Sequence, residues 1–452
     1  MSRKLSRRSF LKGAGVFAAA PLATRLDLFR TFSKSPLLQD VPSVRPITIQ
    51  INDSPWFAGF EALVDLYVET TGNEVNLDVS PFAGMLQKSR NAVQAPESEF
   101  DILNLNEQWY SMFYQGGLVA PLREIDPDFE LDPNIIEYDY ATRWDFDLNY
   151  SGPNGELYGL PINGNIQLYF YRKDLFEENG LSPAETWDDV ASNAAALHNP
   201  PNMHGFTLRT NPSNFEFQAY LVSHGADIVT LDAETGEWVV QLDTPEAVAA
   251  LNTWISLGKN YGPTNLADLD QAANLALMNS GRLAQVHMVS AAAPNFQDPN
   301  QSIVVDQVGA GVVPAGPARR ATMSGIWVMS IPTNLPAERQ QAALTFLKWA
   351  LSKEAQIYYS QAGAIPVRQD VYEELSDDPA LGWWMSAVAE STPYIVGQVR
   401  LAEAPQFFEV LDRRTVEALI GELSPEDAMM EAAREVHTIL QQSGYNVRDL
   451  RS

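Results

Sequence analysis

Residues 159–176, GLPINGNIQLYFYRKDLF, decide the fold of this chain. An apolar run on each side of Asn163-Gly164-Asn165 is rich in aromatic and branched residues, which predicts two buried strands. A short helix over 173–179 follows the second run. Asn-Gly between two strands is typical of a β-hairpin. The alternative is that the chain crosses here from one lobe to another, with the asparagine side chains lining a cleft.

The composition is that of an acidic globular protein. A chain of 452 residues is long for one core and suits two lobes. It holds 30 basic and 57 acidic residues; residues 1–30 contain seven of the basic ones and one acid, which leaves 23 basic against 56 acidic residues. Such a body repels nucleic acid, so we expect no nucleic-acid partner. The lack of cysteine excludes disulfides, thiolate metal sites and a lipid-modified N-terminal cysteine.

The N-terminus is a predicted export signal. The motif SRRSFLK at residues 6–12 is typical of twin-arginine signals, and the weakly apolar run over 13–23 is too short for a permanent span. We therefore expect a signal peptide and linker over 1–40, with 33–43 as linker. The mature protein is expected in the periplasm or another extracytoplasmic compartment.

Strands and helices alternate through the first lobe. Apolar periodicity predicts strands at 47–51, 75–79 and 100–105, and helices at 57–70, 86–93 and 108–115. This order indicates an α/β fold with a largely parallel sheet. In such sheets ligands bind beyond the carboxyl ends of the strands. The loops at 53–56 and 106–109 follow two such ends.

The same alternation continues after the central stretch. Thr186 and Asp189 have the spacing of a capping box and predict a helix to about residue 198. Further strands are predicted at 205–208, 283–289, 308–313 and 323–331, and further helices at 215–223, 244–257, 266–278, 336–351, 353–361, 404–420 and 425–440.

The order of these segments resembles the family 1 extracellular solute-binding proteins, the receptors of carbohydrate-type ABC importers. The resemblance spans nearly all of residues 46–440. The matching stretches are WFAGFEALVDLYVETTG (56–72), 100–122 with its GGLVAPL, 159–176, LMNSGRLAQVHMV (277–289), 325–332, TFLKWAL (345–351), GAIPV (363–367) and the last two helices.

The resemblance implies a two-lobed periplasmic-binding-protein architecture, in which each lobe is a mostly parallel sheet flanked by helices. It favours a crossing at Asn163 over a hairpin and implies further crossings near 313–314 and 365–366. The expected lobes are 46–162 with 314–365 and 163–313 with 366–452. By the same resemblance, the lobes close on a sugar like a hinge and deliver it to the permease subunits of an ABC importer. We expect a monomer without cofactor or metal.

Ligand contacts are implied at loops that face the cleft. A sugar presents C–H faces and hydroxyls, which receptors bind with flat aromatic rings and with carboxylates and amides. The candidate ligand-binding residues are Asp53, Trp56, Asn106, Glu107, Trp109, Asn163, Asn165, Asn214, Phe215, Glu216, Ser290, Trp327 and Gln406.

Several candidates have an alternative, purely structural interpretation. The three tryptophans can pack in the core, and Asp53 and Asn106 can cap helices. Many sugar receptors of the family carry a tryptophan shortly after the strand equivalent to 283–289, whereas Ser290 and three alanines follow it here. This departure permits a larger or non-sugar solute.

The alternative function is a secreted glycoside hydrolase, for which Asp53 and Glu107 are the candidate carboxylate pair. No HExxH or GxSxG motif occurs, and Gly309-Ala310-Gly311 does not open a helix as a dinucleotide loop would. The histidines lack the spacing of metal ligands. We therefore expect a receptor that binds without chemistry.

Overall fold

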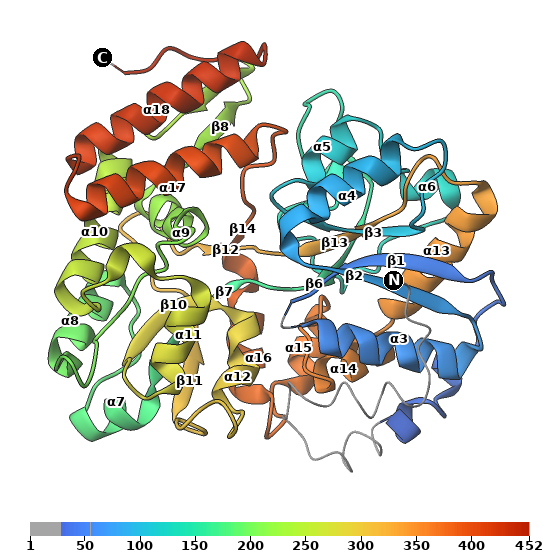
Figure 1. The fold of residues 1–452 in the computed structure, drawn as a ribbon, viewed down its shortest axis with the longest axis horizontal. Coiled ribbons are helices and arrows are strands. Elements are labelled where there is room, and N and C mark those ends of the chain that lie inside the picture. The colour runs from blue at the N-terminus through green and yellow to red at the C-terminus, as the bar shows by residue number, and fades with distance from the viewer. Residues whose placement is uncertain (1–28, 55, 452) are drawn as a thin grey trace. The chain divides into compact units, whose positions relative to one another are not determined.

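The chain folds into two compact units (Figure 1). The computed structural model describes residues 29–54 and 56–451, so residues 1–28 of the predicted signal peptide lie outside the described residues. Unit 1 contains the described residues up to Asn165 together with Gly325–Ala389. Unit 2 contains Ile166–Ser324 and the residues from Glu390 onward. Each unit is therefore assembled from two separate stretches of chain.

The chain changes unit at 165/166, 324/325 and 389/390, where the sequence placed the crossings at 162/163, 313/314 and 365/366. The second crossing comes later because β12 (Thr322–Met323) pairs with β14 (Ile395–Val396) inside unit 2. The third comes later because the chain beyond residue 366 still packs on unit 1, where Arg368 binds Asp132 at 2.7 Å.

Unit 1 is built on a five-stranded sheet in the order β2–β1–β3–β13–β6. Strands β1, β2 and β3 are parallel, whereas β13 is antiparallel to both of its neighbours. Helices α4 and α5 lie on one side of the sheet, and α3 and α14 on the other (Figure 1). The elements of unit 1 are β1 (Ile47–Asn52), α3 (Phe57–Thr71), β2 (Val75–Ser80), α4 (Phe82–Gln94), β3 (Ile102–Asn106), α5 (Tyr110–Gln115), α6 (Leu122–Ile125), β4 (Arg143–Trp144), β5 (Glu156–Leu157), β6 (Leu160–Asn163), β13 (Trp327–Ser330), α13 (Ala337–Ala350), α14 (Lys353–Gln361), α15 (Gln369–Leu375) and α16 (Gly382–Ser391), whose last residues belong to unit 2.

Unit 2 contains a three-stranded sheet in the order β10–β7–β11, in which both outer strands are antiparallel to β7. The prediction of a mostly parallel sheet is therefore wrong for this unit. The partners of β7 are remote in the chain, and local periodicity does not indicate the direction in which they run. Helices α17 and α18 pack side by side (Figure 1). The elements of unit 2 are β7 (Gln167–Arg172), α7 (Lys173–Asn179), α8 (Trp187–Leu197), α9 (Asn214–His224), β8 (Val229–Asp232), β9 (Glu237–Val240), α10 (Pro245–Tyr261), α11 (Gln271–Asn279), β10 (Gln285–Val289), α12 (Ala293–Phe296), β11 (Val308–Gly311), β12, β14, α17 (Ala404–Ile420) and α18 (Pro425–Gln442).

The central stretch is a crossing and not a hairpin. Strand β6 ends at Asn163 on the edge of one sheet, and β7 begins at Gln167 in the middle of the other. At Gly164 an added Cβ would lie 2.1 Å from the carbonyl oxygen of Pro366 and 2.3 Å from the hydroxyl of Tyr138. The glycine is required by this close approach of unit 1 backbone, and not by a turn.

Three other predicted segments differ in the structure. Residues 323–331 form two strands in different units, because the chain crosses at Ser324 in the middle of a continuous apolar pattern. Residues 205–208 are not a strand, since the carbonyls of Gly205 and Leu208 accept from side chains instead of a ladder. The helix predicted over 266–278 is divided, and Asp270 caps its second part, α11.

Part of the predicted linker belongs to the core of unit 1. Residues Pro36–Leu38 form a 3-10 turn, and Leu38 is fully buried. Its carbonyl oxygen accepts a hydrogen bond from the indole of Trp349 at 3.0 Å. Leu38 is therefore part of the fold. The turn-rich composition of residues 33–43 predicted only a linker and did not indicate this packing.

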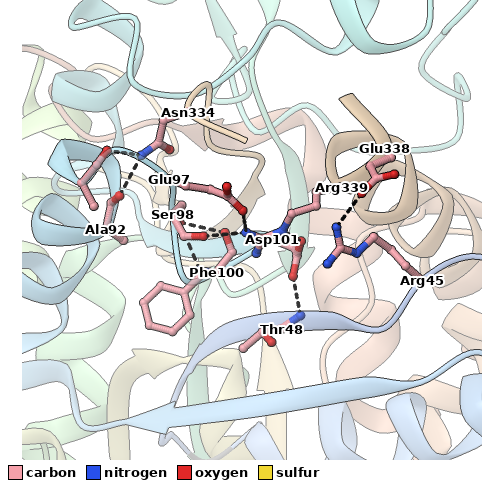
Figure 2. A network of polar contacts seen from close by, with 11 residues as sticks. Arg45, Thr48, Ala92, Glu97, Ser98, Phe100, Asp101, Asn334, Glu338 and Arg339 are labelled. Carbon is pink, nitrogen blue, oxygen red and sulfur yellow. Dashed lines mark hydrogen bonds and ion pairs between the residues drawn. The ribbon is translucent and has the colours of Figure 1, made fainter. Parts of the chain in front are cut away.

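A buried ion pair joins α13 to the sheet of unit 1 (Figure 2). Arg339 donates through Nε to Asp101 at 2.7 Å and through Nη1 to Glu97 and to the carbonyl oxygen of Ser98, both at 2.8 Å. The other oxygen of Asp101 accepts the backbone N–H of Thr48 in β1 at 2.7 Å. Asp101 is 2% exposed and Arg339 is 8% exposed. The pair therefore fixes α13 against β1 with little access to water.

Candidate functional site

Three predicted tryptophans from separate parts of unit 1 meet at one edge of its sheet. Trp56 precedes α3, Trp109 precedes α5, and Trp327 begins β13. The ring centroids of Trp56 and Trp327 are 6.3 Å apart, and those of Trp109 and Trp327 are 6.0 Å apart. They meet because β1 and β3 are parallel and end at the same edge, where the antiparallel β13 starts.

Phe82, which the sequence did not single out, completes this group. It is the first residue of α4, and its ring lies 4.9 Å from Trp109 and 6.0 Å from Trp327. It is 48% exposed, whereas the three tryptophans are buried. Trp56, Phe82, Trp109 and Trp327 are called the aromatic cluster below. The signal that could have found Phe82 is its position just beyond the end of a third parallel strand, β2.

The aromatic cluster carries polar groups that find no partner in the described part of the chain. The indole N–H groups of Trp56 and Trp109 are buried without a hydrogen-bond acceptor. Asn163, the last residue of β6, lies opposite Trp327 in the sheet and is 1% exposed. Among the described residues, neither the amide oxygen nor the amide nitrogen of its side chain has a partner. Since buried polar groups are nearly always satisfied, these groups point to a ligand.

The other predicted residues of unit 1 differ in their surroundings. Glu107 is 1% exposed and accepts the backbone N–H of Ile326 at 3.3 Å. Asp53 is exposed at the end of β1. The side-chain oxygen of Asn106 accepts the backbone N–H of Gln108 at 3.1 Å. This contact between residues two apart is a local turn, so it supports a structural role for Asn106. The carbonyl oxygen of Asn165 accepts from Gly325 at 2.8 Å.

In unit 2 most predicted residues are held by the fold. Asn214 donates from its side chain to both carboxylate oxygens of Asp412 in α17, at 3.0 and 2.9 Å. The hydroxyl of Ser290 accepts the backbone N–H of Ile166 at 3.3 Å. The carbonyl oxygen of Phe215 accepts from Gln167 at 2.8 Å. Gln406 is exposed near the start of α17.

Two predicted residues of unit 2, Phe215 and Glu216, line a small cavity, and Glu216 contributes its carboxyl group. One carboxylate oxygen accepts the backbone N–H of Arg209 at 2.8 Å and the other accepts the indole of Trp254 at 3.2 Å. Burial raises the pKa of Glu216 to about 8, although these donors and the Arg209 cation act in the opposite direction. Beside it lies His287, whose pKa burial lowers to about 3.

Two classes of site have no support among the described residues. Within residues 29–54 and 56–451, no group of three or more histidine and carboxylate side chains is arranged to hold a metal ion. Over the same residues, none of the helices combines the length and apolar character that a membrane span needs.

Comparisons with known proteins indicate one class. Residues 62–382 match the family described as bacterial extracellular solute-binding protein, and residues 4–24 match the twin-arginine translocation signal sequence. The chain is 23% identical over 403 residues to an erythritol/L-threitol-binding protein of Mycolicibacterium smegmatis, which covers 82% of this chain and 83% of the relative. It is 25% identical over 386 residues to a mannitol-binding protein of Pseudomonas aeruginosa, covering 79% of this chain and 84% of the relative.

A solved structure has the same fold. An ABC transporter solute-binding protein from Agrobacterium radiobacter K84, in complex with ribitol, has a TM-score of 0.72 at 22% identity. The match covers 88% of this chain and 99% of that chain.

Proposed function

Since this chain belongs to the bacterial extracellular solute-binding proteins and carries a twin-arginine export signal, we propose that it captures a linear polyol or a small sugar outside the cytoplasm. Closure of its two units on the solute, delivery to the permease subunits of an ABC importer, and action as a monomer are parts of the same proposal.

The observation that supports this solute class is the aromatic cluster with its unpartnered donors and acceptors. The exposed ring of Phe82 offers a flat face to C–H groups, as polyols and sugars require. Asn163 offers one acceptor and two donors to hydroxyls, and the indoles of Trp56 and Trp109 offer two more donors. A neutral, hydroxyl-rich solute matches this mixture better than an ion does.

Two further observations favour a polyol over an oligosaccharide. Two of the relatives are named for erythritol/L-threitol and for mannitol, whereas solved structures of the same fold hold polyols in some cases and oligosaccharides such as maltose in others and so favour neither class. In this chain, Ser290 and the alanines after it provide no aromatic face in the described structure, and Ser290 instead holds Ile166. A linear polyol has no sugar ring that needs a second stacking platform.

The proposal is tested by isothermal titration of the mature protein with D-mannitol, ribitol, erythritol and maltose. A polyol is expected to bind and to be recovered unchanged. At a hundred times its dissociation constant it would also stabilise the protein by about 2.7 kcal/mol. Binding of maltose alone would contradict the polyol class, and hydrolysis of maltose, which alone among the four has a glycosidic bond, would favour the hydrolase alternative.

Replacing Phe82 by alanine is expected to weaken polyol binding by about threefold to tenfold, the amount associated with one aromatic face. Stability should change little because the side chain is 48% exposed. Phe146→Ala is the matched control, since Phe146 is 54% exposed in the same unit and outside the aromatic cluster. Titration of both variants checks the prediction, and equal affinities would remove Phe82 from the site.

Asn163→Leu is expected to weaken binding and yet leave the ligand-free protein as stable as before, or more so. The substitution removes buried polar atoms that no described residue satisfies, so the folded state loses no hydrogen bond, while the ligand loses its partners at about 1–3 kcal/mol. Thermal unfolding and titration measure the two effects.

Asn334→Leu is the matched control for this prediction. The side-chain amide of Asn334 donates to the carbonyls of Ala92 and Ala95, both at 2.9 Å (Figure 2). This variant should lose stability and keep its affinity. A large stability loss in Asn163→Leu would show that Asn163 serves the fold.

A further inference from the structure

A small cavity in unit 2 lies at the point where the chain enters the unit. Its walls include Gln167, Arg209, Glu216, Asn274, His287 and Met288, and the volume open to a water molecule is about 10 Å³. A space of this size holds about one water-sized group. Gln167 begins β7 immediately after the first crossing, and its carbonyl oxygen accepts the hydroxyl of Thr322, just before the second crossing, at 2.5 Å.

The cavity wall contains polar atoms without partners among the residues described. These are the side-chain oxygen of Gln167, Nε of Arg209 and both ring nitrogens of His287. Gln167 is 2% exposed and His287 is 1% exposed, so bulk water does not satisfy them. Each buried polar atom without a partner lowers the stability of the folded state. These atoms therefore indicate that a polar group occupies the cavity in the functional protein.

The chemistry of the wall selects the kind of group. The Gln167 oxygen only accepts, Arg209 Nε–H only donates, and a neutral His287 ring offers one donor and one acceptor. The oxygens of Glu216 are already engaged by Arg209 N–H and by Trp254. A cation would meet the Arg209 guanidinium and an anion would meet the Glu216 carboxyl and the Gln167 oxygen. A hydroxyl, which donates and accepts at once, matches the wall.

We propose that this cavity is a specificity subsite that receives one terminal hydroxyl of a linear polyol, held by Gln167, Arg209 and His287. A hydroxyl within a ring or in mid-chain brings bulky neighbours on two sides, whereas a terminal CH₂OH enters a space for one group. The inference rests on the proposed function and deepens it, because it explains how the protein distinguishes a chain end from a closed ring.

The test is a thermodynamic cycle that combines a change in the ligand with a change in the subsite. Each affinity is measured by titration. Mannitol has two equivalent ends, so both terminal hydroxyls must be removed, and the probes are D-mannitol and 1,6-dideoxy-D-mannitol. The unaltered protein is expected to bind the dideoxy compound at least about tenfold more weakly, because the wall then stays unpaired. In Gln167→Met and in His287→Phe the ratio of the two affinities should fall clearly below that of the unaltered protein, because each variant removes one of the three partners of the hydroxyl.

His437→Phe, at a partly exposed histidine of α18, is the control and should keep the full ratio. Either cavity variant suffices if the other does not fold. A ratio in both variants as large as in the unaltered protein would overturn the subsite and leave an ordered water as its occupant. Failure of the unaltered protein to bind D-mannitol or any other polyol would instead refute the proposed function, and the subsite with it.

Discussion

Replacing Arg339 by methionine is expected to lower the free energy of unfolding of unit 1 by about 3–5 kcal/mol, the usual effect of breaking a buried ion pair from one side. The reason is the carboxylate that remains. Asp101 is 2% exposed, and without Arg339 its carboxylate still accepts the N–H of Thr48 but loses its cation. A buried charge in that state destabilises the fold far more than the lost contact alone.

Figure 2 contains the matched control for this substitution. Arg45 pairs with Glu338 at 3.0 Å, on the residue next to Arg339, but the two side chains are 43% and 75% exposed. Arg45→Met should therefore change stability by less than about 1 kcal/mol. Adding Asp101→Asn to Arg339→Met removes the stranded charge and keeps an acceptor for Thr48, so part of the loss should return.

Urea unfolding, with hydrogen exchange of β1 and β3 peptides to assign the effect to unit 1, measures these differences. Equal losses in Arg339→Met and Arg45→Met would contradict the argument from burial. No recovery in the double variant would show that geometry, and not charge, accounts for the loss.

Acidification from pH 7 to pH 5 is expected to lower the stability of unit 2 by about 2 kcal/mol through His287 alone. In the unfolded chain this ring titrates near pH 6.5, whereas burial lowers its pKa in the fold to about 3. Below pH 6.5 the histidine is therefore protonated in the unfolded state and stays neutral in the folded state. The stability is fully present above pH 6.5 and is lost as the pH falls toward 3.

The lowered pKa of His287 is caused by burial of its ring. The rings of Trp187 and Tyr220 pack against it at 5.6 and 6.0 Å, and Glu216 and Arg209 share its cavity. Glu216 acts in the opposite sense, because its raised pKa of about 8 makes stability fall as the pH rises from 4.5 to 8. The pH dependence of the unfolding free energy therefore contains the opposite contributions of His287 and Glu216.

Comparison of the unaltered protein with His287→Phe isolates the histidine. Both proteins keep Glu216, so the difference between their unfolding free energies should grow by about 2 kcal/mol between pH 7 and pH 5. Parallel curves for the unaltered protein and His287→Phe would mean that the ring accepts a proton in the folded state.

The sequence predicted the elements whose signals are local. The capping box of Thr186 and Asp189 is present, with Asp189 N–H bound to the threonine hydroxyl, and the helix over 173–179 has the predicted bounds. The meeting of Trp56 and Trp109 followed from strand–helix alternation, because parallel strands end at one edge. The family and the two-unit α/β fold are likewise confirmed.

The sequence failed where the deciding partner is remote. Nothing local marks Ser324 as the crossing inside 323–331, since the apolar pattern continues through it. The direction of β10 and β11 beside β7 depends on pairing across more than a hundred residues of chain in each case. Gln167, Arg209 and His287 were missed because only three-dimensional packing distinguishes a buried polar atom with a partner from one without.

The central position of β13 in the sheet of unit 1 constrains the order in which the protein can be made. Strand β13 lies between β3 and β6, yet it follows them by more than 160 residues, after the whole first stretch of unit 2. While the ribosome synthesises that stretch, β3 and β6 both present open edges of the kind that aggregate. The sheet of unit 1 is therefore complete only after β13 has been synthesised, and until then we expect its two open edges to need protection from aggregation. An export route for folded proteins, such as the twin-arginine pathway, suits a chain whose first sheet is completed only by a strand from its second half.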